Sequence, residues 1–154
     1  MDEYFDNFLI LDKFNVSRET FSTLNEFREK IIEKNNEINL ISTKSTSNSM
    51  NRHIIDCAQV IDLIDINSKT CTDIGSGAGL PGIVLSILVR DKKIDMKMNL
   101  YEKSYRKSSF LRSVSKKLKL DTEIFEEDIF KKKNLVSGSI VARAFKPLPL
   151  ILDL

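Results

Sequence analysis

The sequence has 154 residues, 42% of them hydrophobic and 30% charged, which is enough for one globular domain, and its net charge of +2 does not by itself indicate a nucleic-acid-binding protein. No apolar run approaches the roughly 18 residues of a membrane span, and the acidic start MDEYFDNFLIL lacks the basic residues of a secretory signal, so we expect a cytoplasmic protein without membrane contact. The widely spaced Cys57 and Cys71 and a single histidine predict reduced thiols and no zinc site.

The first part of the chain predicts helices. Over residues 18–38 apolar side chains recur near helical spacing after Ser17, a candidate N-cap; they are Phe21, Leu24, Phe27, Ile31 and Ile38. Residues 42–49 are polar and predict a loop, and residues 51–65 predict a second helix with Ile54, Ala58, Ile61 and Ile64 on one stripe. We therefore expect residues 1–66 to form a helical extension.

From residue 67 onward the pattern alternates between strands and helices. Strands are predicted over 69–74, 97–101, 123–125 and 139–142, and helices over 81–90 and 104–119. Pro81 is well suited to the first turn of the helix that it opens. The alternation predicts an α/β, Rossmann-like sheet of about four parallel strands within residues 67–154, with right-handed crossovers and helices on both faces.

Basic residues gather in two segments of this second part. Seven of them and no acid lie between residues 103 and 119, and Lys131, Lys132 and Lys133 form a second cluster. These clusters could form a phosphate-binding surface, or they could be ordinary solvated helix faces.

A glycine-rich loop, Asp73 to Gly82 (DIGSGAGLPG), joins the first predicted strand to the next helix. Read from Gly77 it spells GxGxxG, and Glu102 follows Gly82 by 20 residues, as in dinucleotide-binding proteins. Read from Asp73 it spells DxGxGxG, which favours S-adenosylmethionine, because an acid before the first glycine suits a positively charged amino group and not a pyrophosphate. A glycine-rich turn without a ligand is the third interpretation.

Glu102 ends the second predicted strand, at the edge of the sheet where α/β proteins bind ligands. We predict that its carboxylate binds both ribose hydroxyls of the cofactor. The alternative is a surface acid paired with Lys103 or Arg106.

Four segments in order along the chain together resemble one family. They are EINLIS (37–42), RHIIDC (52–57), DIGSGAGLPGI (73–83) and IVARAF (140–145). They are similar to the NLT, RHILDS, cofactor-loop and SRAF segments of the bacterial 16S ribosomal RNA methyltransferase G family, also called glucose-inhibited division protein B. The resemblance implies a class I S-adenosylmethionine methyltransferase sheet with an N-terminal helical extension, which methylates a guanine N7 of 16S ribosomal RNA in the 30S subunit.

The resemblance also implies roles for individual residues. Gly75, Gly77, Gly79 and Leu80 would contact the cofactor with Asp73, and Glu102 would bind its ribose. The candidate catalytic residues, which would line the cofactor–substrate cleft, are Asn39, His53, Asp56 and Arg143. Because guanine N7 has a lone pair and no proton, these residues would position the reactants and not act as a base. The simpler alternatives are a turn residue (Asn39), a helix cap or structural histidine (His53) and ion pairs (Asp56 with Arg52, and Arg143).

The chain departs from the family pattern in two places. Glu127 and Asp128 replace an Arg-Ala-Glu-like segment, so Asp128 is a candidate to accept a hydrogen bond from the adenine amino group. The chain stops at Leu154, where the family continues with a helix and three strands, so we expect a C-terminally truncated product, an incomplete sequence, or a homodimer that covers the exposed sheet edge.

The alternative functions are an inactive relative that binds only cofactor or RNA, and an NAD-dependent oxidoreductase.

Overall fold

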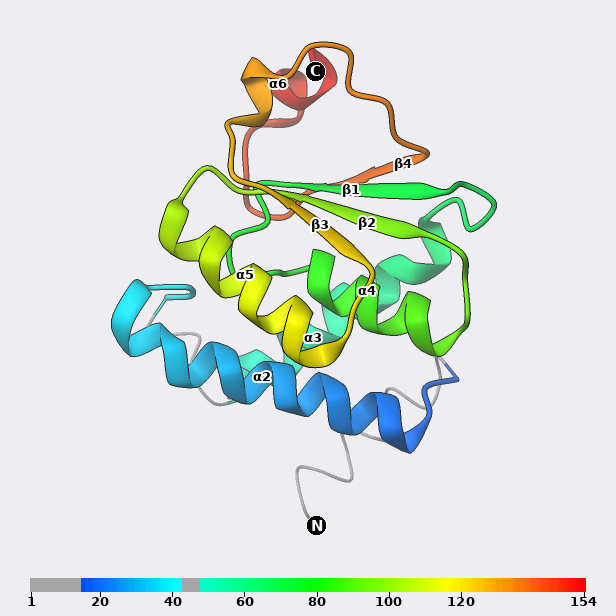
Figure 1. Ribbon diagram of the computed structural model, residues 1–154, viewed down its shortest axis with the longest axis vertical. Helices are drawn as coiled ribbons and strands as arrows, with labels where there is room; N and C mark the ends of the chain where they lie inside the picture. The colour runs from blue at the N-terminus through cyan, green and yellow to red at the C-terminus, as the bar shows by residue number, and fades with distance from the viewer. Residues whose placement is uncertain (1–14, 43–47) are drawn as a thin grey trace.

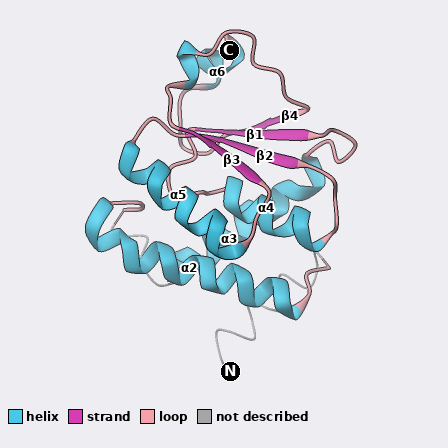
Figure 2. Ribbon diagram, in the orientation of Figure 1, coloured by secondary structure: helices cyan, strands magenta, loops and turns pink. Residues whose placement is uncertain are grey.

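The computed structural model describes residues 15–42 and 48–154, which form a four-stranded sheet with its long helices on one side (Figure 1; Figure 2). In chain order the elements are α2 (Arg18–Ile38), α3 (Asn48–Ala58), η2 (Gln59–Leu63), β1 (Thr70–Ile74), α4 (Gly82–Asp91), β2 (Lys97–Tyr101), α5 (Tyr105–Leu118), β3 (Thr122–Phe125), η3 (Ile129–Lys131), β4 (Ser139–Val141) and α6 (Leu148–Leu152). The acidic N-terminal segment and most of the polar stretch 42–49 lie outside the described residues.

The sheet confirms the predicted α/β fold with four parallel strands. Its order is β3-β2-β1-β4, and every pairing is parallel. The chain steps outward from β1 to β2 and β3 and then returns to the other side of β1 for β4. This reversal of direction creates a switch point at the carboxyl ends of β1 and β4, which is where sheets of this kind leave a crevice for ligands.

The distribution of helices over the two faces differs from the prediction. Helices α2, α3, α4 and α5 all lie on one face of the sheet (Figure 1). Two right-handed crossovers that step in the same direction, β1 to β2 and β2 to β3, place their helices on the same face. The connection from β3 to β4 runs over the opposite face, and within the described residues it contains only the short η3, with α6 following β4 on that side (Figure 2).

One hydrophobic core joins the N-terminal helices to the sheet. Phe27 of α2, Ala58 of α3, Leu85 of α4 and Leu100 of β2 are all fully buried in it. Helix α4 is buried on every side over residues 82–89, because it is packed between the sheet and the N-terminal helices. The apolar stretch that opens at Pro81 therefore predicts the helix correctly, although Pro81 is the N-cap residue and the first turn begins at Gly82.

The N-terminal helices follow the predicted pattern, except that α3 begins at Asn48, inside the stretch 42–49 that was predicted as a loop, and ends earlier than predicted. Ser17 caps α2, since its side-chain oxygen accepts a hydrogen bond from the Thr20 amide at 3.1 Å. The stripe Ile54, Ala58, Ile61 and Ile64 is buried as predicted. The α-helix nevertheless ends at Ala58, and the chain continues as the 3₁₀-helix η2.

The last helix, α6, was not predicted. Its Leu148, Leu150 and Leu152 are exposed, whereas Ile151 packs with Leu154 against a small second cluster around Ile74 and Tyr101. None of the helices in the described residues is both long enough and apolar enough to cross a bilayer.

Candidate functional site

A cavity of about 540 Å³ opens at the carboxyl ends of the strands. The segments that follow all four strands line it, and so do the start of the α2–α3 connection and helix α3. The lining includes Gly75–Ala78, Tyr101–Lys103, Glu127–Ile129 and Arg143–Lys146, together with Leu40–Ser42, His53, Leu80 and Lys107. The cavity thus lies at the switch point of the sheet, where the topology leaves room for a ligand.

The glycine loop forms the floor of this cavity. Gly75 and Ser76 donate their amides to the Tyr101 carbonyl at 2.9 Å, which ties the loop to the end of β2. Gly75 has a φ of +71°, and the ring of Phe145 occupies the space where a Cβ would lie. Gly77 has a φ of +55°, and the nearest atom that a Cβ would meet is the Gly75 carbonyl oxygen at 3.8 Å. A ligand can therefore approach the backbone closely at Gly77, whereas Phe145 already covers Gly75.

Asp73 lies beneath the loop and does not line the cavity. It is completely buried, and its Oδ2 accepts a hydrogen bond from the Gly82 amide at 2.9 Å. Burial raises the pKa of Asp73 to about 7, although the hydrogen bonds from Gly82 and Ser76 act in the opposite direction. In the part of the chain that the structure describes, Oδ1 has no hydrogen-bond partner. Asp73 thus holds the loop against the start of α4. Gly79 also lies outside the cavity lining, and its amide donates to the Ser76 carbonyl at 2.7 Å, which closes the turn.

Glu102 stands at the wall of the cavity, with only 9% of its surface exposed. Its Oε2 accepts from the Gly77 amide at 2.9 Å, and its Oε1 accepts from the Ser104 amide at 2.8 Å. The alternative of a surface acid paired with Lys103 or Arg106 is wrong, because the carboxylate is buried and bonded to the backbone. Each of its oxygens keeps a second acceptor site, so the carboxylate can still accept from two hydroxyl groups of a ribose.

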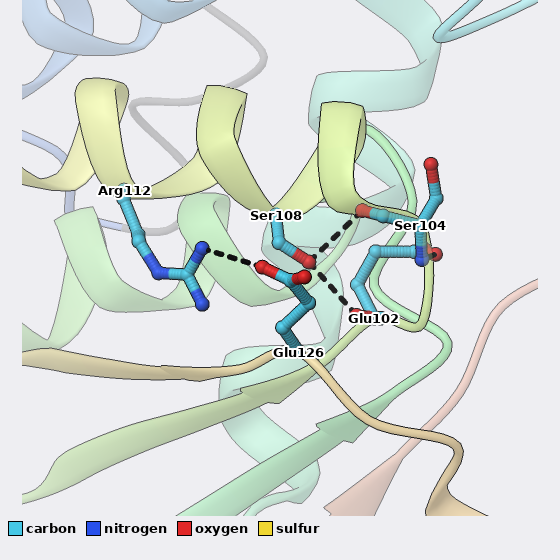
Figure 3. A network of polar contacts seen from close by, with 5 residues as sticks. All are labelled: Glu102, Ser104, Ser108, Arg112 and Glu126. Atoms are coloured by element: carbon cyan, nitrogen blue, oxygen red, sulfur yellow. Dashed lines mark hydrogen bonds and ion pairs between the residues drawn. The ribbon is translucent and has the colours of Figure 1, made fainter.

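A polar network holds Glu102 in this position (Figure 3). The buried Ser108 hydroxyl lies 2.8 Å from the Glu102 carbonyl oxygen and 3.0 Å from that of Ser104, which fastens the first turns of α5 to the end of β2. Arg112 pairs with Glu126 at 2.9 Å and ties α5 to the segment after β3. Our sequence interpretation missed Ser108, although its position one helical turn after Ser104 is a pattern that could have indicated it.

The basic clusters reach the cavity only in part. Lys103 and Lys107 line it, together with Lys146, whereas Arg112 is paired with Glu126. Lys132 lies 3.8 Å from the Glu127 carboxylate and above the Phe125 ring. The positive charge that faces the cavity therefore comes from the start of α5 and from the segment after β4.

His53 and Arg143 meet at the cavity wall, although they come from distant parts of the chain. An Nη2 of Arg143 lies 2.5 Å from Nδ1 of His53, and its Nη1 donates to the Cys57 sulfur at 3.3 Å. Cys57 was not among the predicted site residues; its spacing of four residues from His53 on one helix could have indicated it.

Of the three remaining predicted site residues, Asp128, Asn39 and Asp56, only Asp128 lines the cavity. Asp128 lines the cavity, and its Oδ1 accepts from the Phe130 amide at 3.1 Å, so it also caps η3. Asn39 is exposed and ends α2 in the left-handed conformation at φ 47°, while the three residues after it line the cavity. Asp56 is exposed beside a second hollow near β4, and in the described residues no ion pair joins it to Arg52.

Known proteins resemble this chain over nearly its whole length. The family model described as "GidB: rRNA small subunit methyltransferase G" matches residues 20–153. A ribosomal RNA small subunit methyltransferase G from Pelagibacter ubique (strain HTCC1062) is 51% identical over 156 residues, which cover 100% of this chain and 73% of the relative. Another, from Bartonella tribocorum, is 38% identical over 143 residues, which cover 91% of this chain and 66% of the relative.

A solved structure shares the fold at low sequence identity. It is described as a protein-L-isoaspartate O-methyltransferase from Plasmodium falciparum in complex with S-adenosyl-L-homocysteine. The TM-score is 0.58 at 16% identity, and the match covers 99% of this chain and 79% of that chain. The arrangement of strands and helices described above is therefore one that a methyltransferase also adopts.

Proposed function

Because this chain belongs to the rRNA small subunit methyltransferase G family, we propose that it transfers a methyl group from S-adenosylmethionine to N7 of a guanine in 16S ribosomal RNA. The observation that carries the proposal is the cavity at the switch point, where Gly77 is open to a ligand and the Glu102 carboxylate stands beside it. The fold neighbour that holds S-adenosyl-L-homocysteine supports the choice of cofactor.

The residues of the cavity suit the parts of this cofactor. Glu102 would bind the ribose hydroxyls, and Asp128 would accept a hydrogen bond from the adenine amino group. Gly75, Gly77 and Leu80 supply the loop beside which the cofactor would lie. S-adenosylmethionine, when bound, supplies a methyl carbon on a positively charged sulfur. Asp73 and Gly79 would act indirectly, by holding the shape of the loop.

Basic side chains line part of the cavity, and the proposed reaction needs no general base. Lys103, Lys107, Lys146 and Arg143 would bind phosphate groups of the RNA or the carboxylate of the cofactor. Guanine N7 has a free lone pair and carries no proton, so the site has no proton to remove. The residues would therefore contribute by aligning the guanine and excluding water.

The ligand of the loop can be tested by isothermal titration calorimetry. We expect S-adenosylmethionine to bind and NAD not to bind, because the chain belongs to a methyltransferase family. Binding of NAD alone would support the oxidoreductase alternative and contradict the proposal.

Catalytic competence needs a separate assay. Purified protein, radiolabelled S-adenosylmethionine and 30S subunits that lack the modification should give labelled 16S ribosomal RNA, with the label on a guanine N7. If the cofactor binds and no label reaches the RNA, the chain only binds its ligands, which is the alternative that we kept open.

Replacement of Glu102 by alanine tests the cofactor site directly. We expect S-adenosylmethionine to bind more weakly by roughly 1–3 kcal/mol, because hydrogen bonds to a charged group are lost. Glu123→Ala is a matched control, since Glu123 is an exposed acid that pairs with Lys97 on the sheet. Calorimetry that finds equal affinities for the Glu102→Ala protein and the control would remove Glu102 from the site.

A further inference from the structure

We propose that His53 and Cys57 are positioning residues that hold the Arg143 guanidinium at the wall of the cavity, and that His53 does so only in its uncharged form. The inference rests on the proposed function, in which Arg143 binds an anionic group. It gives the N-terminal helical extension a role in positioning Arg143, because both His53 and Cys57 belong to α3.

The geometry places two acceptors on one helix face beside one arginine. His53 and Cys57 are four residues apart on α3, so their side chains point the same way. Arg143 follows β4 and reaches both of them through different nitrogens, Nη2 to His53 Nδ1 and Nη1 to Cys57 Sγ. Two contacts through separate nitrogens fix the plane of the guanidinium, which one contact would not do.

Both partners are neutral, so the charge of Arg143 stays available. Burial raises the pKa of the Cys57 thiol to about 11. Burial also lowers the pKa of His53 below its usual value of 6.5, and the neighbouring Arg143 adds to this effect. In the described residues Arg143 forms no ion pair with a carboxylate, and it lines the cavity. It can therefore give a full positive charge to an anionic group of the cofactor or of the RNA.

The contact also determines the proton on the histidine ring. An arginine nitrogen can only donate, so Nδ1 must accept and the single ring proton must lie on Nε2. The charged groups that act on His53 are Arg143 from the segment after β4 and, on α3 itself, Asp56, which raises its pKa, and Arg52, which lowers it. A protonated His53 would have a hydrogen on both nitrogens and would repel Arg143.

Nuclear magnetic resonance can test the contact without reference to activity, because His53 is the only histidine of the chain. In protein labelled with ¹⁵N-histidine we expect one tautomer, with Nε2 protonated and Nδ1 bare. In the Arg143→Ala protein we expect a mixture of tautomers and a titration that moves to higher pH. Mixed tautomers in the unsubstituted protein, or an unchanged titration in Arg143→Ala, would overturn the proposal.

Three substitutions at His53 separate positioning from mere packing. His53→Asn puts an amide oxygen near the place of Nδ1 and cannot be protonated, whereas His53→Gln puts its amide near the place of Nε2. We expect His53→Asn to retain ligand affinity and to keep it as the pH falls from 7 to below the pKa of His53, which the resonance titration locates, while the unsubstituted protein binds more weakly over that range. We expect His53→Gln and His53→Ala to bind roughly tenfold or more weakly at pH 7, the loss typical of one hydrogen bond to a charged group. Equal losses in all three variants would overturn the proposal.

The readouts also identify the anion and keep the two proposals apart. A weaker affinity for S-adenosylmethionine alone indicates the cofactor carboxylate, and a raised KM for 30S subunits at saturating cofactor indicates an RNA phosphate; either result supports the role of His53. Cys57→Ala should impair the same quantity that the His53 variants impair, either the affinity for S-adenosylmethionine or the KM for 30S subunits. Cys71→Ala is the control, because Cys71 is a second buried cysteine and lies in β1. If the unsubstituted protein neither binds the cofactor nor methylates RNA, the proposed function fails, while the resonance experiment still decides on the contact.

Discussion

At the scale of single residues, Asp73 is a member of the loop motif that is buried beneath the loop and does not line the cavity. Its position before the glycines predicts a contact with the amino group of the cofactor. In the structure β1 directs this side chain into the interior, where it accepts a hydrogen bond from Gly82 at the start of α4. The sequence pattern identifies the residue as part of the loop, but only the folded structure shows that its side chain is buried and contacts the start of α4 instead of the cavity.

The raised pKa of Asp73 predicts a pH dependence of stability. Since the unfolded carboxyl has a pKa near 3.8 and the folded one about 7, the native state holds more protons between these values. The free energy of unfolding should therefore fall as the pH rises through this window and remain at the lower level above it. The Asp73→Asn side chain cannot ionise, so this variant lacks the pH-dependent part of the free energy of unfolding that comes from Asp73.

Urea unfolding of both proteins at pH 5 and pH 8 checks this prediction. The stability of the unsubstituted protein relative to Asp73→Asn should decrease from pH 5 to pH 8. A constant difference between the two proteins would mean that Asp73 keeps an ordinary pKa in the fold.

At the scale of elements, the ends of helices are where local sequence and tertiary contacts act together. Ser17 caps α2 through its side-chain oxygen, and the same hydroxyl donates to Asp91 at the end of α4 at 3.0 Å. The cap was predictable from the residue type and position. The link to Asp91 was not, because it depends on how α2 lies across α4.

Ser17→Ala should destabilise the fold by about 1 kcal/mol, the usual loss for a helix N-cap, and somewhat more if the link to Asp91 contributes. Thermal or urea unfolding measures this change. Ser17→Thr is the control, since it keeps a hydroxyl at the same place, and an equal loss in both variants would show that the cap contributes nothing.

At the scale of the whole molecule, the helical extension and the sheet share one core. Phe27 of α2 is fully buried in the same cluster as Leu85 of α4 and Leu100 of β2. The sequence pattern changes between residues 1–66 and 67–154, and we propose that the two parts unfold as one compact unit.

Phe27→Ala tests this cooperativity. We expect a loss of roughly 3–5 kcal/mol in the free energy of unfolding, because a large cavity would form in the shared core. Circular dichroism, which follows the helices, and the fluorescence of Tyr101 and Tyr105, measured in a Tyr4→Phe background, should shift together. Leu63→Ala, at a side chain that is 84% exposed, should change stability by no more than about 0.5 kcal/mol. If only the dichroism signal shifts, the extension unfolds separately.

The sequence by itself determined the order of the four strands and of the long helices α2 to α5, the glycine loop and the carboxylate at the end of β2. These features depend on the spacing of apolar residues and on the position of glycines, which involve only residues close together in the sequence. The fold class followed from them because alternating strands and helices leave few topologies open.

Only the tertiary structure decided which of these residues meet. Arg143 lies 90 positions from His53 and 86 from Cys57, and no local pattern in either segment indicates their contact. The same is true of the Phe145 ring over Gly75 and of the long helices on a single face of the sheet. Contacts of this kind depend on the direction of each crossover and on how the elements pack, and those are properties of the whole folded chain.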